Sequence, residues 1–201
     1  MPDLPFRLTL ASGSRGRREL LERAGYTFDV RPADIDEPTE ARLGDVRHYV
    51  AELAWLKAQR VASLVADGVV LAADTVGWQH GRVVGKPDDA DHARRIIGAL
   101  QGTTHELWTG VCLWCVPSGW QVTWQEVSVV RMAAMTAADI ERYIETRQWV
   151  GCSGAYAVRM PDDPLLTVER GTVSNVIGLP MESLAAALEG LASAEFLGGG
   201  Q

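Results

Sequence analysis

Residues 45–74, which read DVRHYVAELAWLKAQRVASLVADGVVLAAD, decide the fold. Asp45 suits an N-terminal cap, and the apolar residues after it recur at helical spacing, so we expect a helix from Asp45 to about Ala66. Gly68 is a typical residue to end such a helix. Residues 69–73 then form a continuous apolar run, typical of a strand buried on both faces, and we expect that strand to end at Asp74. This order of elements indicates an α/β protein.

The flanking segments extend this pattern into a mixed, twisted sheet with flanking helices. A basic segment over residues 17–24 is a candidate helix, and a turn signal at 117–119 lies between two β-prone runs that form a hairpin. Candidate strands besides 69–73 are 7–11, 26–30, 83–87, 107–115, 121–130, 151–158 and 165–168.

The chain shows no internal repeat and no linker rich in Pro, Gly or Ser. We therefore predict one domain over residues 1–201, with hinge candidates near 101–106 and 131–136.

The composition excludes several classes of partner. With 19 Lys+Arg and 26 Asp+Glu, the formal net charge is −7, and the pI is near 5.1. Affinity for nucleic acids and for anionic membranes depends on clustered positive charge, so we expect neither a nucleic-acid polymer nor a membrane as partner.

The chain has three cysteines, too few for a disulfide framework, which fits a reducing compartment and predicts a cytoplasmic protein. Cys112 and Cys115 have the spacing of a metal-binding pair. Residues three apart on a strand point to opposite faces, so we interpret this pair as core packing.

A candidate phosphate site lies where the first strand passes into the first helix. Ser12 and Ser14 provide hydroxyls, the glycines between and after them leave backbone N–H groups accessible, and Arg17 adds a positive charge. Cations lie unfavourably at the positive end of a helix dipole, and a bound anion would remove that conflict. The alternative interpretation is a capped helix with a solvated basic first turn.

Three carboxylates are candidates for metal binding or for activating water: Asp36 and Glu37 in an acidic loop, and Asp74 after the buried strand. Ligands in open α/β sheets gather at the carboxyl ends of strands, which favours a functional role for Asp74. The alternatives are a solvated loop acid for Glu37 and a turn or cap residue for Asp74.

Two lysines are candidates to neutralise phosphate charge. Lys57 interrupts the apolar stripe of the long helix, and Lys86 lies between Gly85 and Pro87 in a tight segment. The alternatives are a lysine covering the edge of the core and an ordinary loop lysine. Together, carboxylates and cations on separate strand-end loops indicate a site for a metal–polyphosphate complex.

These segments together resemble the Maf family over nearly the whole chain. The resemblance rests on many short motifs in the expected order rather than on any one of them. They are Leu10-Ala11-Ser12-Gly13-Ser14-x-x-Arg17-Arg18-Glu19-Leu20-Leu21, Asp36-Glu37, Leu53-Ala54-x-x-Lys57-Ala58, Ala73-Asp74-Thr75-Val76, Gly85-Lys86-Pro87, Leu100-x-Gly102-x-x-His105, Thr109-Gly110-Val111, Gly154-Ala155-Tyr156 and Asn175-Val176-Ile177-Gly178-Leu179-Pro180.

The resemblance implies a two-lobed α/β fold, similar to inosine triphosphatases, with a central cleft. It implies a nucleoside triphosphate pyrophosphatase that releases a monophosphate and pyrophosphate and removes unwanted nucleotides from the pool, with a divalent cation, Mg²⁺ or Mn²⁺, as cofactor. The site residues that it implies are Ser12, Ser14 and Arg17 for phosphates, Glu37 and Asp74 for the metal, and Asp74, Glu37, Lys57 and Lys86 for catalysis.

The base preference stays open at this point. Candidate base-pocket positions are Gly16, Thr75 and Arg159. Family members that act on dTTP and UTP resemble one another in carrying Arg and Gln at the first and third of these positions, and those that prefer 7-methyl-GTP carry Trp at the first and Gln at the second. This chain matches neither group, although Thr75 agrees with the former.

Two other functions are alternatives. One is a nucleotide sensor that regulates cell division or septum formation without turnover, and the other is a phosphatase for non-nucleotide phosphates. The oligomeric state, monomer or homodimer, also stays open.

Overall fold

The computed structural model describes residues 3–36, 45–116, 118–158 and 163–193. Its centre is a mixed seven-stranded sheet in the order β2-β1-β3-β5-β6-β7, with β4 paired to β3. Pairing is parallel between β1 and its two neighbours and antiparallel elsewhere. The strands are β1 (Leu8–Leu10), β2 (Asp29–Val30), β3 (Gly68–Gln79), β4 (Arg82–Val84), β5 (Thr104–Val116), β6 (Gln121–Met132) and β7 (Leu166–Arg170).

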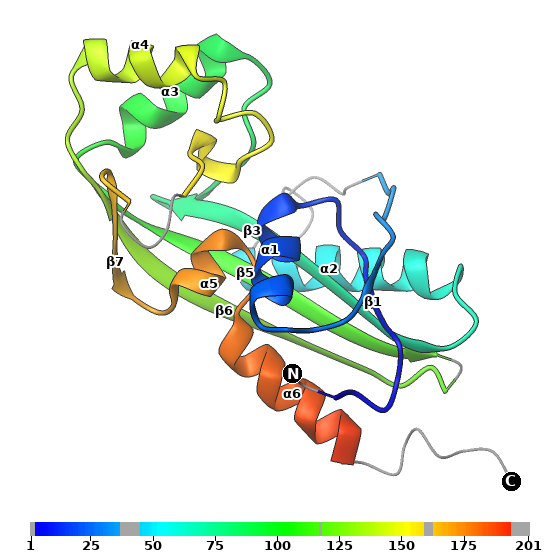
Figure 1. The fold of residues 1–201 in the computed structure, drawn as a ribbon. Helices are drawn as coiled ribbons and strands as arrows, with labels where there is room; N and C mark the ends of the chain where they lie inside the picture. Colours follow the sequence, from blue (N-terminus) through cyan, green and yellow to red (C-terminus); the bar gives the residue numbers. More distant parts are fainter. Residues whose placement is uncertain (1–2, 37–44, 117, 159–162, 194–201) are drawn as a thin grey trace, which may run out of the picture.

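The helix predicted from residue 45 is α2 (Val46–Ala62), with Asp45 as its N-cap. It covers one face of β3 and β5 (Figure 1). Gly110 on β5 permits the close approach, because a Cβ there would lie 2.2 Å from the carbonyl oxygen of Val50. The opposite face of the sheet is covered by α1 (Arg15–Arg23) and α6 (Met181–Ser193), whose leucines join those of β1, β3 and β5 in a second core.

The long hairpin was predicted and is confirmed as β5 and β6, which pair from Thr104–Arg131 to Trp114–Gln121. Cys112 and Cys115 are both buried in separate hydrophobic clusters, on opposite faces of β5, which confirms their interpretation as core residues.

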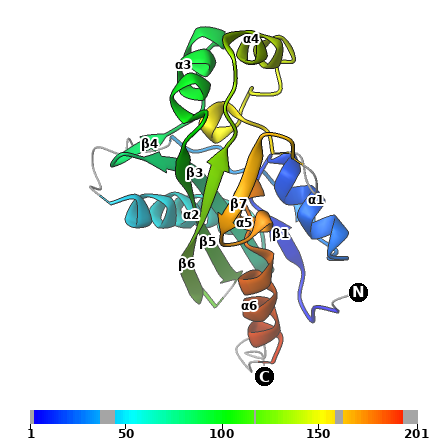
Figure 2. The same cartoon turned by 90° about the vertical axis from the view of Figure 1, so that its left-hand side faces the viewer.

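The far ends of β5 and β6 carry a separate group of elements (Figures 1 and 2). It contains α3 (Ala90–Leu100), α4 (Ala137–Glu145) and the 3-10 turn η2 (Ser153–Ala155), packed around a core of their own with β7. Figure 2 shows two lobes joined by the sheet, which agrees with the predicted two-lobed architecture.

The prediction of a strand over 151–158 is wrong, because the chain turns there. Gly151, Gly154 and Ala155 have positive φ values of 75°, 72° and 55°, which no strand accommodates. The small helix α5 (Val173–Ile177) lies between β7 and α6. In the part of the chain that is described, no helix is long and apolar enough to cross a membrane.

Candidate active site

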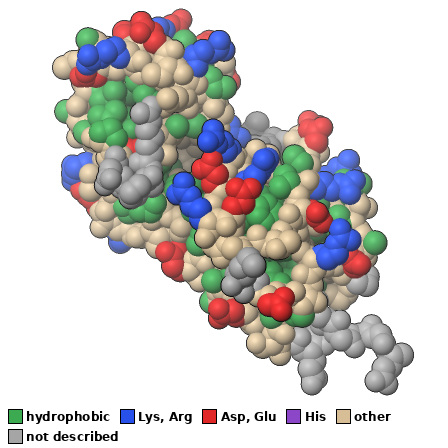
Figure 3. Space-filling model, viewed as in Figure 1, with side chains coloured by type: hydrophobic (Ala, Val, Ile, Leu, Met, Phe, Trp, Pro, Cys, Tyr) green, Lys and Arg blue, Asp and Glu red, His purple; other side chains and the backbone are tan. Residues whose placement is uncertain are grey.

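A cavity of about 1080 Å³ lies between the two lobes, where basic and acidic side chains gather (Figure 3). Apart from Asp36, the sequence-predicted residues within the described ranges all line it, although they come from four separate segments of the chain. They are Ser12, Ser14, Gly16, Arg17, Lys57, Asp74, Thr75 and Lys86. We call the part formed by Ser12, Arg17, Lys57, Asp74 and Thr75 the polar wall.

The prediction that Asp74 ends its strand is wrong, because β3 continues to Gln79. Along one edge of β3, β1 pairs only as far as Leu71 and β4 begins at Gly77. Asp74 lies in the gap between these two partners, opposite Gly110 of β5 on the other edge. The strand whose carboxyl end reaches the cavity is therefore β1, which leads through Ala11 into Ser12.

Asp74 forms a buried ion pair with Lys57 of α2. Only 6 % of Asp74 and 9 % of Lys57 is exposed. The lysine Nζ therefore lies on a carboxylate beside the cavity and does not extend to solvent at the core edge. A buried charge without a counter-charge is costly, so removal of either residue would leave the other uncompensated.

Ser14 is the N-cap of α1, as the capped-helix interpretation predicts, and accepts a bond from the backbone N–H of Arg17 at 3.4 Å. The backbone N–H of Ser14 in turn donates to the Ser12 hydroxyl at 3.1 Å. The start of this helix lines the cavity and has no acidic residue in its first turn, so its positive end is available to an anion.

Arg17 joins two residues of the polar wall to the end of α5. Its guanidinium donates to the carbonyl of Gly178 at 2.8 Å, to the Ser12 hydroxyl at 3.1 Å and to the Thr75 hydroxyl at 3.1 Å. Thr75 also hydrogen-bonds the hydroxyl of Thr109 at 2.9 Å. The predicted phosphate ligand thus also positions the loop after β1 against β3.

Lys86 lies on the segment after β4 and is exposed. The 3-10 turn holds this segment, since Gly154 N–H donates to the Gly85 carbonyl at 3.0 Å and the Ser153 hydroxyl donates to the Thr75 carbonyl at 2.9 Å. Burial raises the pKa of the neighbouring Cys152 thiol, and the charge of Lys86 opposes that shift. Lys86 therefore brings a second cation, on a flexible side chain, to the cavity from the other lobe.

Two predicted residues, Glu37 and Arg159, lie outside the described residues. Gly16 lies close to α5, because a Cβ on it would come within 2.8 Å of the Ile177 side chain. The backbone there is thus packed too closely for a larger residue without movement of Ile177.

The chemistry of the polar wall suits a hard divalent cation. Among the described residues no group of three or more His, Cys, Asp or Glu side chains is placed to hold a metal ion. Mg²⁺, however, commonly takes one or two protein carboxylates and completes its shell with substrate phosphates and water. The Asp74 carboxylate at the cavity is a suitable ligand of this kind.

His105 also lines the cavity and is not among the residues predicted for the site. Burial lowers its pKa to about 4. The signal was present in β5, where His105 alternates in phase with Leu107, Thr109 and Val111, the inward-facing positions of that strand.

Comparison with known proteins identifies the family. The family model of Maf-like proteins matches residues 7–191. A dTTP/UTP pyrophosphatase of Rhodopirellula baltica is 39% identical over 186 residues, covering 92% of this chain and 82% of that protein. A dTTP/UTP pyrophosphatase of Anaeromyxobacter dehalogenans is 43% identical over 187 residues, covering 90% and 92%.

The fold is also that of a solved structure, the Ham1 protein of Staphylococcus aureus, with a TM-score of 0.54 and 12% identity over 92% of this chain and 99% of that one. The predicted class of protein, a nucleotide pyrophosphatase, is confirmed by the named relatives. The chain belongs to the Maf-like family.

Proposed function

We propose that this Maf-like protein hydrolyses the α–β phosphoanhydride of dTTP or UTP, and so removes pyrimidine triphosphates from the nucleotide pool. The substrate class is that of its relatives from Rhodopirellula baltica and Anaeromyxobacter dehalogenans. Three free cysteines, two of them buried in the core, support a location in the reducing cytoplasm.

The observation that carries this proposal is the convergence of hydroxyls, cations and a buried carboxylate at the cavity. The triphosphate would lie along the polar wall, with phosphate oxygens at the N-terminus of α1, where Ser12, Ser14 and Arg17 meet. Lys57 approaches from α2 and Lys86 from the opposite side, so the phosphate chain is neutralised from two directions.

The reaction adds water at the α-phosphorus. A new bond forms between the water oxygen and that phosphorus, the bridging bond to the β-phosphate breaks, and pyrophosphate leaves with the bonding electron pair. Asp74 accepts the proton released by the water, while Lys57 and Lys86 stabilise the negative charge that gathers on pyrophosphate. Before substrate arrives, the ion pair with Lys57 holds the Asp74 carboxylate in place beside the cavity.

The proposed cofactor is Mg²⁺ or Mn²⁺, with Asp74 and Glu37 as its protein ligands. When bound, the cation supplies charge stabilisation at the phosphates and orients the reacting groups. Its role is tested by removing divalent cations with a chelator, which should abolish turnover, and by restoring activity with added Mg²⁺ or Mn²⁺.

A panel of nucleoside triphosphates, standard and methylated, tests the substrate and the reaction. We expect monophosphate and pyrophosphate from dTTP and UTP, separated by chromatography, and little product from purine triphosphates. Release of orthophosphate would instead identify a phosphatase, and binding without any turnover would identify a nucleotide sensor.

A further inference from the structure

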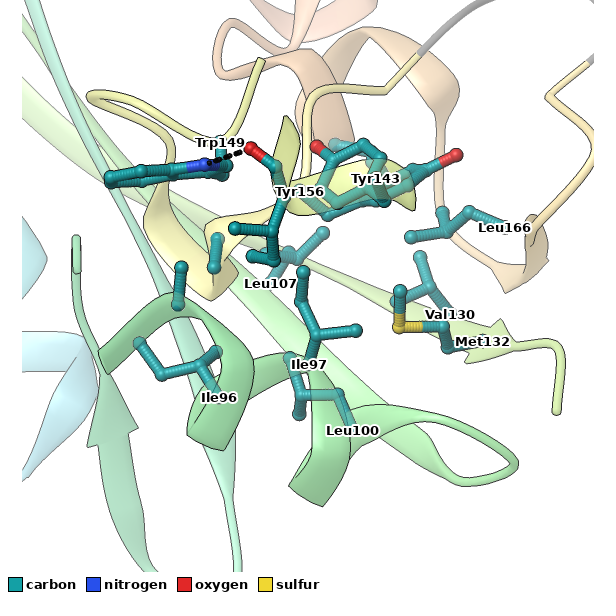
Figure 4. Close-up of a cluster of buried hydrophobic side chains, with 14 residues drawn as sticks. Ile96, Ile97, Leu100, Leu107, Val130, Met132, Tyr143, Trp149, Tyr156 and Leu166 are labelled. Carbon is teal, nitrogen blue, oxygen red and sulfur yellow. Dashed lines mark hydrogen bonds between the residues drawn. The ribbon is translucent and has the colours of Figure 1, made fainter. Parts of the chain in front are cut away.

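One part of the cavity lining differs from the polar wall. It is lined by side chains that also belong to the hydrophobic core of the lobe that contains α3 and α4. We call this part of the lining the apolar wall. Its members are Leu100, Leu107, Met132, Tyr156, Leu166 and Val176. In this core Tyr143 and Tyr156 lie on one side, with ring centroids 5.1 Å apart, and Ile97 and Leu100 lie on the other (Figure 4).

One side chain beside the apolar wall carries a buried polar atom without a partner among the described residues. His105 of β5 lines the cavity and is only 5 % exposed. Its Nδ1 atom is fully buried and has no hydrogen-bond partner among the described residues. An unsatisfied buried nitrogen costs roughly 1–3 kcal/mol, so it calls for a partner that the described protein does not supply.

The position of His105 on β5 relates it to the polar wall. Thr109, two inward-facing positions along the same strand, bonds Thr75 in that wall. Four residues of antiparallel strand span about 14 Å, the scale of a nucleotide. A substrate with its phosphates on the polar wall would therefore direct its base along β5 toward His105.

We infer that His105 is a specificity-determining residue that hydrogen-bonds, through Nδ1, the polar edge of the pyrimidine base of the substrate. The inference rests on the proposed function, since it takes the phosphates to lie on the polar wall. A base is planar and largely apolar on its faces, which suits the leucine, methionine and tyrosine side chains around it. Its edge carries the donor and acceptor groups that the orphaned nitrogen lacks.

The ionisation state of His105 agrees with such a partner. With a pKa of about 4, the ring is neutral at pH 7. A neutral imidazole has one donor and one acceptor nitrogen, and it matches an uncharged base better than a cation would in an apolar surrounding.

Two variants and a control test the inference through kinetics. His105→Phe keeps a ring without the nitrogens, and His105→Asn keeps a polar atom near the place of Nδ1. Ser128→Ala removes another buried polar group from the same sheet, one that bonds Asn175 and Thr172 and does not line the cavity.

For His105→Phe we expect kcat/KM on dTTP and UTP to fall roughly 10- to 100-fold, with little change on the poorer purine triphosphates, so that base selectivity is lost. His105→Asn should recover part of this selectivity. Ser128→Ala should lower the unfolding temperature and leave the base selectivity unchanged. An equal loss on every triphosphate would assign His105 a structural role and overturn the inference.

A second measurement uses the unaltered protein and needs no turnover. Nuclear magnetic resonance of the protein with isotope-labelled histidine would follow His105 Nδ1 on addition of α,β-imido-dTTP, a non-hydrolysable analogue. We expect the Nδ1 resonance to shift on saturation with the analogue, and absence of that shift would overturn the inference. Failure of the wild-type protein to hydrolyse any triphosphate would overturn the proposed function alone, since the resonance experiment would still decide the role of His105.

Discussion

On the polar wall Arg17 donates to three oxygen atoms and Lys57 lies on the carboxylate of Asp74, whereas on the apolar wall His105 has a buried nitrogen without a partner among the described residues. The polar wall is pre-organised, so its groups hold their geometry before substrate binds. On the apolar wall, the Nδ1 atom of His105 has no partner among the described residues and is the atom to which we assign the ligand contact. Under the proposed function, the preformed network would bind the phosphates, and the further inference assigns selection of the base to His105.

The largest expected effect is that of Asp74→Asn on the polar wall. Loss of the proposed base should lower kcat about 10³-fold for every triphosphate alike. The change also removes a buried counter-charge from Lys57, so we expect about 3 kcal/mol less unfolding free energy in urea titrations. Asp67→Asn, at an exposed residue that does not line the cavity, is the matched control, with near-normal kcat and stability. An Asp74→Asn protein with wild-type turnover would remove Asp74 from the mechanism.

Arg17→Lys is expected to have the next largest effect. A lysine cannot make the three separate bonds of the guanidinium, so KM should rise about tenfold and stability should fall by about 1–2 kcal/mol. Steady-state kinetics and thermal unfolding measure the two changes. The neighbouring Arg18 is exposed, and Arg18→Lys should alter neither quantity. Equal behaviour of the two variants would show that the network around Arg17 contributes little.

The pH dependence of stability examines the apolar wall by itself. The folded pKa of His105, about 4, lies below the ordinary value of 6.5, so the unfolded chain binds the proton more readily. The contribution of neutral His105 is therefore fully present above about pH 6.5 and is lost as pH falls toward 4. Between about pH 6.5 and pH 5 the unfolding free energy should fall by about 1.5 kcal/mol through this group. Urea titrations of the wild-type protein and of His105→Phe at both pH values measure this fall. An equal change in unfolding free energy for the two proteins would contradict a buried neutral histidine.

The smallest effect is expected away from both walls. Arg94 of α3 pairs with Glu141 of α4 at 2.7 Å, and the pair is solvent-exposed. Arg94→Ala should therefore cost less than about 1 kcal/mol and leave kcat/KM and base selectivity unchanged. A change in base selectivity would mean that α3 and α4 influence recognition of the base, and that the apolar wall alone does not determine this selectivity.

Much of this site could be predicted from the sequence because its residues break local patterns. Lys57 interrupts an apolar helical stripe, and the structure shows it buried on a carboxylate. The basic start of α1 contradicts the helix dipole, and it lines the cavity. In each case a residue unsuited to its element indicated a role beyond folding.

The rest depended on contacts between distant segments. Asp74 is a poor strand residue, so a strand end was expected, but pairing with β5 and the ion pair with α2 outweigh that preference. The turn at 153–155 is held by hydrogen bonds to Gly85 and Thr75, which lie far earlier in the chain. No local sequence pattern predicts such bonds. His105 could be placed on an inward face, but its lack of a partner is visible only in three dimensions.

The central claim is that water attacks the α-phosphorus of the substrate. The most direct test is hydrolysis of dTTP by the wild-type protein in ¹⁸O-labelled water, with Mg²⁺ present and the products analysed by mass spectrometry. The account predicts that the label enters the nucleoside monophosphate, because water attacks the α-phosphorus on the polar wall. Label found in pyrophosphate, or release of orthophosphate in its place, would contradict it.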